Sequence, residues 1–178
     1  DIASHGGRPV DAREQILEIL RQAYQIEVDG YTFYSMTAAQ AKKPAVKELF
    51  EKLAHDEVQH QNFLKSVGQR YDAEGAAAFA VAKPPVALSG ITDHVFTTRL
   101  HEQAKGAAFE MGVLSVGLTL ETNAMAYFNG AADAANSGQV QSFYRYLADW
   151  EKQHFDALNT LYSAIRSDFW GAGRFAPF

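Results

Sequence analysis

Residues 53–64 read LAHDEVQHQNFL, and residues 147–158 read LADWEKQHFDAL. The two segments are identical at six positions, and each contains a Glu-x-x-His motif: Glu57 with His60, and Glu151 with His154. Residues three apart lie on the same face of an α-helix, so each motif presents a carboxylate beside an imidazole. Two such pairs of metal-binding side chains are therefore predicted, one in each half of the chain.

The offset of 94 residues between these segments also relates the sequence before them, without a gap. It relates Leu20 to Leu114, Glu27 to Glu121, and the aromatic pair at 33–34 to the pair at 127–128. Each half then consists of one helix with a single glutamate and a second helix with Glu-x-x-His. We interpret this pattern as an internal repeat of a helix pair.

Four long segments have apolar residues at helical spacing, and the alternation typical of strands is scarce. We predict helices over 11–40, 44–69, 105–135 and 139–167, the first beginning with a capping box of Asp11 and Glu14. Pro44 suits the first turn of the second helix. We predict an all-α, ferritin-like four-helix bundle in one domain over 1–178. It consists of helix pairs at about 11–69 and 105–167, a long crossover at 70–104 and an aromatic, irregular tail at 168–178. Residues 92–103 are expected to form a short helix or the lead-in to the third long helix.

The composition narrows the classes of function. The chain has 178 residues, a formal net charge of −5 and no dense run of Lys or Arg, so we expect neither nucleic acid nor membrane as a partner. It has no cysteine, which excludes disulfides and thiolate ligands and leaves histidine and carboxylates to hold any metal. The first residues show no charged segment followed by an apolar run, so we predict a cytoplasmic protein.

Glu121 is the only charged residue between Met111 and Ala132. An isolated carboxylate buried there would cost several kcal/mol unless neutralised, hydrogen-bonded or bound to metal. Glu27 lies in a similar apolar context. A single Glu-x-x-His is often just two solvated side chains, but two copies in register favour a shared site. The polar residues within 111–132 favour a buried bundle helix over a membrane span.

Four ionised carboxylates balance the charge of two divalent cations, and neutral imidazoles complete such a ligand set. We therefore predict a centre of two iron ions, with manganese or zinc as alternatives, and assign the four glutamates as the catalytic residues. The predicted metal ligands are Glu27, Glu57, His60, Glu121, Glu151 and His154.

Through these residues, and through Ile26-Glu27, Phe33-Tyr34 and the segment 53–60, the sequence resembles the rubrerythrin branch of the ferritin-like superfamily. The resemblance spans nearly the whole chain. It implies a non-haem di-iron oxidoreductase that reduces hydrogen peroxide or dioxygen, often as a homodimer, with an electron donor that is unknown here. It also implies that the glutamates act as terminal or bridging ligands and that each histidine binds one ion.

The sequence departs from rubrerythrins in two ways. It lacks the four cysteines of their rubredoxin module, and neither Leu118 nor Ala124, one turn from Glu121, supplies their additional carboxylate. The ligand set is closer to the symmetric set of bacterioferritins. Iron storage with ferroxidase activity and a manganese catalase-like enzyme therefore stay as alternatives.

Other residues received weaker interpretations. His94 and His101 lie near acidic residues and are candidates for an accessory metal site or simply surface histidines. His55 is expected in solvent and His5 in a loose terminus. Three tyrosines near the predicted centre are either core residues or groups that relay electrons or steady a ligand: Tyr24, Tyr31 and Tyr34. The aromatic tail is expected to cover an apolar patch or a neighbouring subunit.

Overall fold

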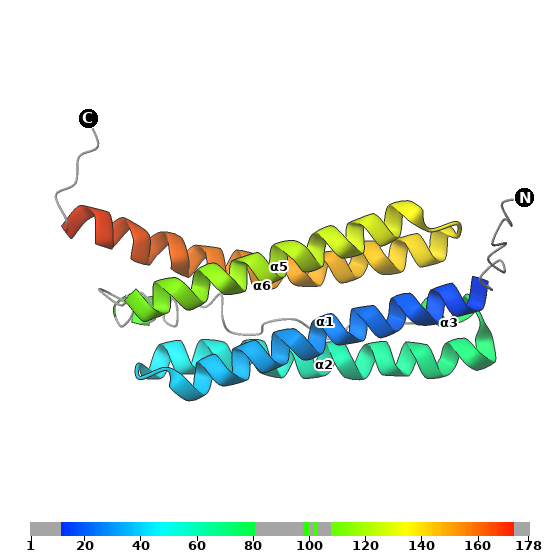
Figure 1. Cartoon of the computed structure of the whole chain (residues 1–178), viewed down its shortest axis with the longest axis horizontal. Coiled ribbons are helices and arrows are strands. Elements are labelled where there is room, and N and C mark those ends of the chain that lie inside the picture. The colour runs from blue at the N-terminus through cyan, green and yellow to red at the C-terminus, as the bar shows by residue number, and fades with distance from the viewer. Residues whose placement is uncertain (1–11, 81–97, 100–101, 103–107, 173–178) are drawn as a thin grey trace, which may run out of the picture.

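The computed structural model describes residues 12–80, 98, 99, 102 and 108–172. Its helices are α1 (Ala12–Gln40), α2 (Pro44–Glu74), α3 (Ala77–Ala80), α5 (Ala108–Ala134) and α6 (Gly138–Ala172). Figure 1 shows α1 and α2 as one antiparallel pair and α5 and α6 as a second pair that lies along the first. The all-α, ferritin-like bundle expected from the sequence is thus confirmed.

Local signals explain the boundaries of α2. Lys43 is extended, with φ −98° and ψ 122°, and Pro44 occupies the first turn, where its missing N–H has no helical partner. At the other end, Gly75 has φ 58°, a conformation that glycine adopts without steric cost. Its N–H donates to the carbonyl of Tyr71 at 2.9 Å. Proline and glycine therefore mark the two ends of the helix.

Two predicted boundaries and part of the crossover are wrong. α2 ends at Glu74 and not at Gln69, because Leu64, Val67 and Tyr71 continue one buried stripe. The ring of Tyr71 lies 5.5 Å from that of Phe79 on α3, a short helix within the predicted crossover. Packing thus extends helical structure past Gln69.

The fourth helix was also predicted too short. α6 continues to Ala172 and not to Ser167, since no proline interrupts its backbone hydrogen bonds there. The first residues of the predicted tail are therefore helical. The described residues do not include Asp11 of the capping box, 81–97, 103–107 or 173–178.

The core forms two apolar clusters, one toward each end of the bundle. The first includes Leu20, Leu64, Phe128 and Tyr144, and the second includes Tyr34, Leu53, Leu114 and Leu158. On each of α1, α2, α5 and α6, the residues of one cluster precede those of the other along the chain. The turns between them carry the predicted ligands, so a polar layer crosses the middle of the bundle.

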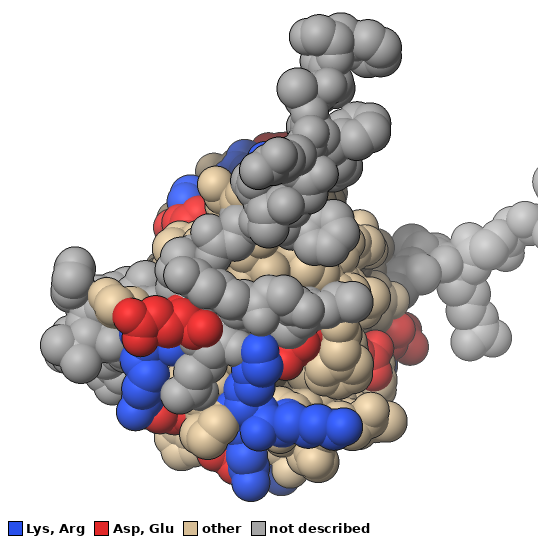
Figure 2. All heavy atoms as spheres, turned by 90° about the vertical axis from the view of Figure 1, so that its left-hand side faces the viewer, with Lys and Arg blue, Asp and Glu red and all other residues tan. Residues whose placement is uncertain are grey.

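Charged side chains of both signs lie at the end of the bundle where α1 turns into α2 (Figure 2). Lys47 contacts Glu51 at 3.7 Å, and Glu48 pairs with both Lys52 and Arg99. Such exposed pairs contribute little stability. Among the described residues, no helix combines the length and the apolar character that a membrane span requires.

Candidate metal centre

The structure brings the six residues predicted as ligands into one buried layer. Glu27 comes from α1, Glu57 and His60 from α2, Glu121 from α5, and Glu151 and His154 from α6. Each of these side chains is at most 2% exposed. Apart from tyrosine and tryptophan, the only other buried polar or charged residues among those described are Thr37 and Glu110, at 4% and 6% exposed. The polar layer is therefore almost entirely the predicted set.

The first group of side chains lies between α1 and α2. Nδ1 of His60 lies 3.0 Å from Oε2 of Glu27 and 3.4 Å from Oε2 of Glu57. Gln61 also donates from Nε2 to the backbone carbonyl of Glu27 at 3.1 Å, which ties the two helices together at this level. One imidazole nitrogen and two carboxylates thus face a common point.

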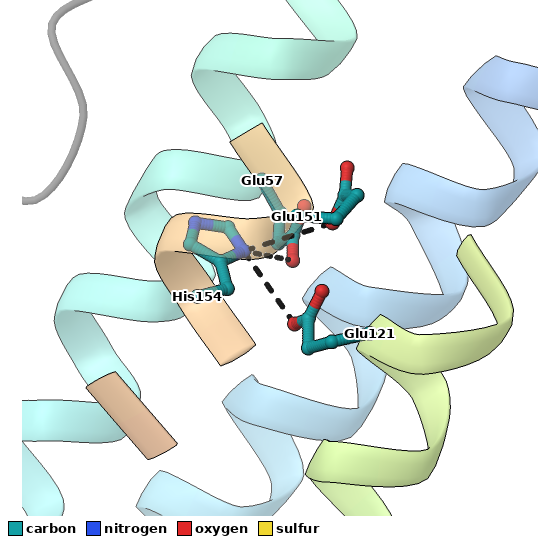
Figure 3. Close-up of side chains that lie close together, drawn as sticks. All are labelled: Glu57, Glu121, Glu151 and His154. Carbon is teal, nitrogen blue, oxygen red and sulfur yellow. Dashed lines mark ion pairs between the residues drawn. The ribbon is translucent and has the colours of Figure 1, made fainter. Parts of the chain in front are cut away.

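The second group surrounds His154 (Figure 3). Nδ1 of His154 lies 3.3 Å from Oε1 of Glu57, 3.5 Å from Oε1 of Glu121 and 3.9 Å from Oε2 of Glu151. The three carboxylates come from three different helices and point toward the imidazole. This group offers four donors where the first offers three.

Glu57 belongs to both groups. Its Oε2 faces His60 and its Oε1 faces His154, so one carboxylate lies between two imidazole nitrogens. The two histidine rings are nearly parallel, with centroids 5.2 Å apart. A carboxylate in this position has the geometry needed to bridge two cations.

Burial and mutual repulsion change the ionisation of these groups. Burial raises the pKa of Glu27 to about 8, and the charge of Glu57 adds to the shift. Burial, with the charges of Glu27 and Glu121, raises the pKa of Glu151 well above its ordinary value. The cluster therefore retains protons when no cation neutralises it.

The shifted pKa values of Glu121 and His154 reflect the pairing of His154 with carboxylates. Burial opposes ionisation of Glu121, but the nearby His154 lowers the pKa of this glutamate below its ordinary value. Burial likewise opposes the charged form of His154, while Glu57 and Glu121 raise its pKa well above the usual range. His154 and Glu121 thus stabilise each other as an ion pair.

Several buried polar atoms of the layer have no hydrogen-bond partner among the described residues. They are Oε1 of Glu27, Oε2 of Glu57, Oε1 of Glu151 and both ring nitrogens of His154. Buried polar atoms are rarely left unpaired, and each needs an explanation. Within each group, the candidate donor atoms lie within 4.8 Å of one another. Carboxylate oxygen and imidazole nitrogen suit iron, manganese and zinc, so both groups could hold a metal ion.

The layer has supporting residues that the sequence analysis missed or left undecided. The hydroxyl of Tyr34, fully buried, donates a hydrogen bond to Oε1 of Glu121. Burial and the charge of Glu121 raise the pKa of Tyr34, so the phenol keeps its proton. Trp150 stacks on His60 with ring centroids 4.1 Å apart, and Oδ2 of Asp56 lies 3.9 Å from Nε2 of His154. Asp56 and Trp150 directly precede the motif glutamates, which is the signal that could have identified them.

A cavity of about 270 Å³ leads to one side of the layer, between α1 and α5. Three of the predicted ligands line it, Glu57, Glu121 and Glu151, whereas neither His60 nor His154 does. The rest of its lining consists of Ile26, Asp29, Gly30, Leu120, Asn123, Ala124 and Tyr127. Small molecules therefore have space beside the carboxylates.

The remaining predictions have mixed outcomes. His55 is exposed, as predicted, whereas His5, His94 and His101 lie outside the described residues. Of the three tyrosines, Tyr34 steadies a carboxylate, Tyr31 is 41% exposed and Tyr24 is half-buried. Leu118 packs against the second apolar cluster and Ala124 lines the cavity.

Comparison with known families agrees with this architecture. The family model Rubrerythrin matches residues 18–108, just over half of the chain, and this range includes most of α1 and all of α2 and α3. Neither a search of curated proteins nor a search of solved structures gave a match. Glu27, Glu57 and His60 lie in the matched range, and α6 adds a second Glu-x-x-His beyond it. The chain is therefore a member of the rubrerythrin family.

Proposed function

We propose that this protein binds two iron ions in the buried layer and is a non-haem di-iron oxidoreductase that reduces hydrogen peroxide or dioxygen. The observation that carries the proposal is the position of Glu57 between His60 and His154, at 3.4 and 3.3 Å from their Nδ1 atoms. Two donor groups that share one carboxylate match the arrangement of carboxylate-bridged di-metal bundles.

In this proposal, Glu27 and His60 would hold one ion, Glu121, Glu151 and His154 would hold the other, and Glu57 would contribute to both groups. The bound iron would supply the redox and Lewis-acid chemistry. The carboxylates balance the charge of the ions, and Glu27 and Glu151 release their protons when the ions bind. Tyr34 holds the Glu121 carboxylate in place through its hydrogen bond.

The cavity between α1 and α5 supports a small oxidant as substrate. It leads to Glu57, Glu121 and Glu151, on the side of the layer that carries no histidine. Apolar side chains form much of its wall, which suits a small uncharged molecule such as hydrogen peroxide or dioxygen. None of the 178 residues is a cysteine, so none of them can ligate a rubredoxin-type iron, and the electron donor is unknown.

The ligand assignment is tested by metal analysis of the purified full chain. We expect about two metal ions per chain. Glu57→Ala, which removes a carboxylate that faces both histidines, should lose both ions, and Glu121→Ala should lose at least the ion beside His154. Glu51→Ala is the matched control, because Glu51 lies on α2 but is exposed and pairs only with a surface lysine. Full metal content in both ligand variants would refute the assignment.

The oxidant is tested by loading iron(II) without oxygen and then adding peroxide or dioxygen. A much faster reaction with peroxide supports the peroxidase. Elemental analysis of protein from its native source distinguishes iron from manganese, which the same oxygen and nitrogen ligands also suit.

A second candidate function is ferroxidase activity within an iron-storage assembly. Neither Leu118 nor Ala124 can supply a further carboxylate, so the ligand set consists of four glutamates and two histidines. This symmetric set favours the second function. Size-exclusion chromatography separates the two functions. We expect a homodimer for the oxidoreductase, whereas a large multimer with mineral growth under dioxygen would favour storage.

A further inference from the structure

The 94-residue offset relates the predicted ligands in pairs but does not preserve their supporting residues. Tyr34 corresponds to Phe128, and Asp56 corresponds to Trp150. In both cases a polar side chain in the first half has an apolar or much less polar counterpart in the second. The two ends of the metal layer are therefore supported differently.

Tyr34 supports the group around His154. Its hydroxyl donates to Glu121, and its ring stands edge-on to the His154 ring at 6.4 Å. Phe128, the counterpart of Tyr34, has no hydroxyl and cannot donate to Glu27. Only Glu121, of the two single glutamates, thus has a phenol that fixes its orientation.

Asp56 supports the same group. Its Oδ2 lies 3.9 Å from Nε2 of His154, while Nδ1 of this ring faces Glu57, Glu121 and Glu151. At this distance the contact is an ion pair and not a hydrogen bond. A carboxylate on that side of the ring still favours a proton on Nε2, which leaves Nδ1 free to bind metal. His60 is instead stacked against the indole of Trp150, which brings no negative charge.

The group around His154 also has more candidate metal ligands than the group around His60. The group around His154 has four donors within 4.8 Å of one another, and the group around His60 has three, with Glu57 common to both. A larger and better-oriented donor set needs less rearrangement when a cation binds. Partner groups of this kind typically contribute about 10- to 100-fold to metal affinity.

From this asymmetry, which rests on the proposed di-metal function, we infer that the two metal positions are not equivalent. The position formed by Glu121, Glu151 and His154 binds its ion first and more tightly. Tyr34 and Asp56 are positioning residues that establish this order, because they hold a ligating carboxylate and a ligating imidazole before the ion arrives.

The test is an oxygen-free titration of the metal-free full chain with cobalt(II), followed by calorimetry and by the absorption of the bound ion. We expect two phases whose dissociation constants differ by about tenfold or more. Glu121→Gln should remove the tighter phase and Glu27→Gln the weaker one. The opposite assignment would overturn the inference.

Tyr34→Phe and Asp56→Asn should each weaken the tighter phase by about 10- to 100-fold while leaving the weaker phase nearly unchanged. Their matched controls are Tyr144→Phe and Asp149→Asn. Tyr144 is a buried tyrosine whose hydroxyl has no partner among the described residues, and Asp149 is exposed. Circular dichroism confirms that each variant is folded before titration.

The outcomes separate this inference from the proposed function. Two ions bound in one indistinguishable phase would overturn the order of binding and leave the di-metal function intact. A chain that binds no cobalt(II), zinc or iron(II) would overturn both. Equal weakening of both phases by Tyr34→Phe and Asp56→Asn would show a general structural role and also overturn the inference.

Discussion

Gly30 on α1 lies directly against the carboxylate of Glu57 on α2. A Cβ atom added at Gly30 would come within 2.7 Å of Oε1 and 2.9 Å of Cδ of Glu57. Contacts under about 3 Å do not occur between such atoms, so the carboxylate would have to move. Glu57 is the residue that faces both histidines, and its position therefore depends on the missing side chain at Gly30.

The first prediction follows from this contact. Gly30→Ala should displace Glu57 and weaken metal binding by about 10- to 100-fold, the range observed when residues around metal ligands are changed. Gly68→Ala is the control, because a Cβ atom there would meet no atom within 4 Å. This control should retain metal and gain about 0.5–1 kcal/mol in unfolding free energy, since alanine favours helices over glycine. Unchanged metal affinity in Gly30→Ala would contradict the prediction.

The cavity between α1 and α5 can be filled without changing a ligand. Ala124 is buried in its wall, and Ala124→Leu adds volume there. We expect the metal content to stay unchanged and iron(II) oxidation by peroxide to slow by about tenfold, or about 1.4 kcal/mol in activation free energy. Ala126→Leu, at an exposed position of the same helix, is the control. An undiminished rate in Ala124→Leu would mean that the oxidant enters elsewhere.

The raised pKa of Glu27, about 8, predicts how the stability of the metal-free protein depends on pH. A group whose pKa is higher in the folded state stabilises the fold at low pH, and this contribution is lost as pH rises through the folded-state value. His154 and Glu151, whose pKa values are also raised, act in the same direction. The free energy of unfolding should therefore fall between about pH 5 and pH 8.

Urea unfolding in the presence of a chelator, repeated across this pH range, measures the effect. Each pKa unit corresponds to about 1.4 kcal/mol. Glu27→Gln should flatten the decline, and Glu14→Gln, at an exposed position of α1, should not. Stability that rises from pH 5 to pH 8 in the metal-free wild type would contradict the prediction.

Trp150 joins the polar layer to the apolar core. Its ring stacks on His60, with ring centroids 4.1 Å apart. It also packs edge-on against Phe63 and Tyr146, with centroids 5.0 Å away in both cases. The residue is 1% exposed. Trp150→Ala should lower the unfolding free energy by about 3–5 kcal/mol, the usual cost of truncating a buried tryptophan.

Thermal and denaturant unfolding check the prediction for Trp150, with Trp150→Phe as the smaller change. A loss below about 1 kcal/mol in Trp150→Ala, which is typical of surface sites, would contradict the packing described here.

Much of the architecture was predictable because its signals are local. Helical periodicity identified all four long helices, and Pro44 marked where α2 begins. The predicted ends of α2 and α6 were wrong. α2 continues through the stripe that packs Tyr71 against Phe79, and α6 continues because no proline interrupts it. The end of α2 thus depends on a packing contact that the helical pattern alone does not reveal.

The sequence alone determined which side chains meet in the middle of the bundle, because the spacing of Glu57 and His60 and its recurrence 94 residues later are properties of the chain itself. Only the tertiary structure decided how Tyr34 meets Glu121, how Asp56 faces His154 and why Gly30 cannot carry a side chain. These contacts depend on the rotation and register of one helix against another. Those parameters are set by the packing of the whole core and not by any local pattern.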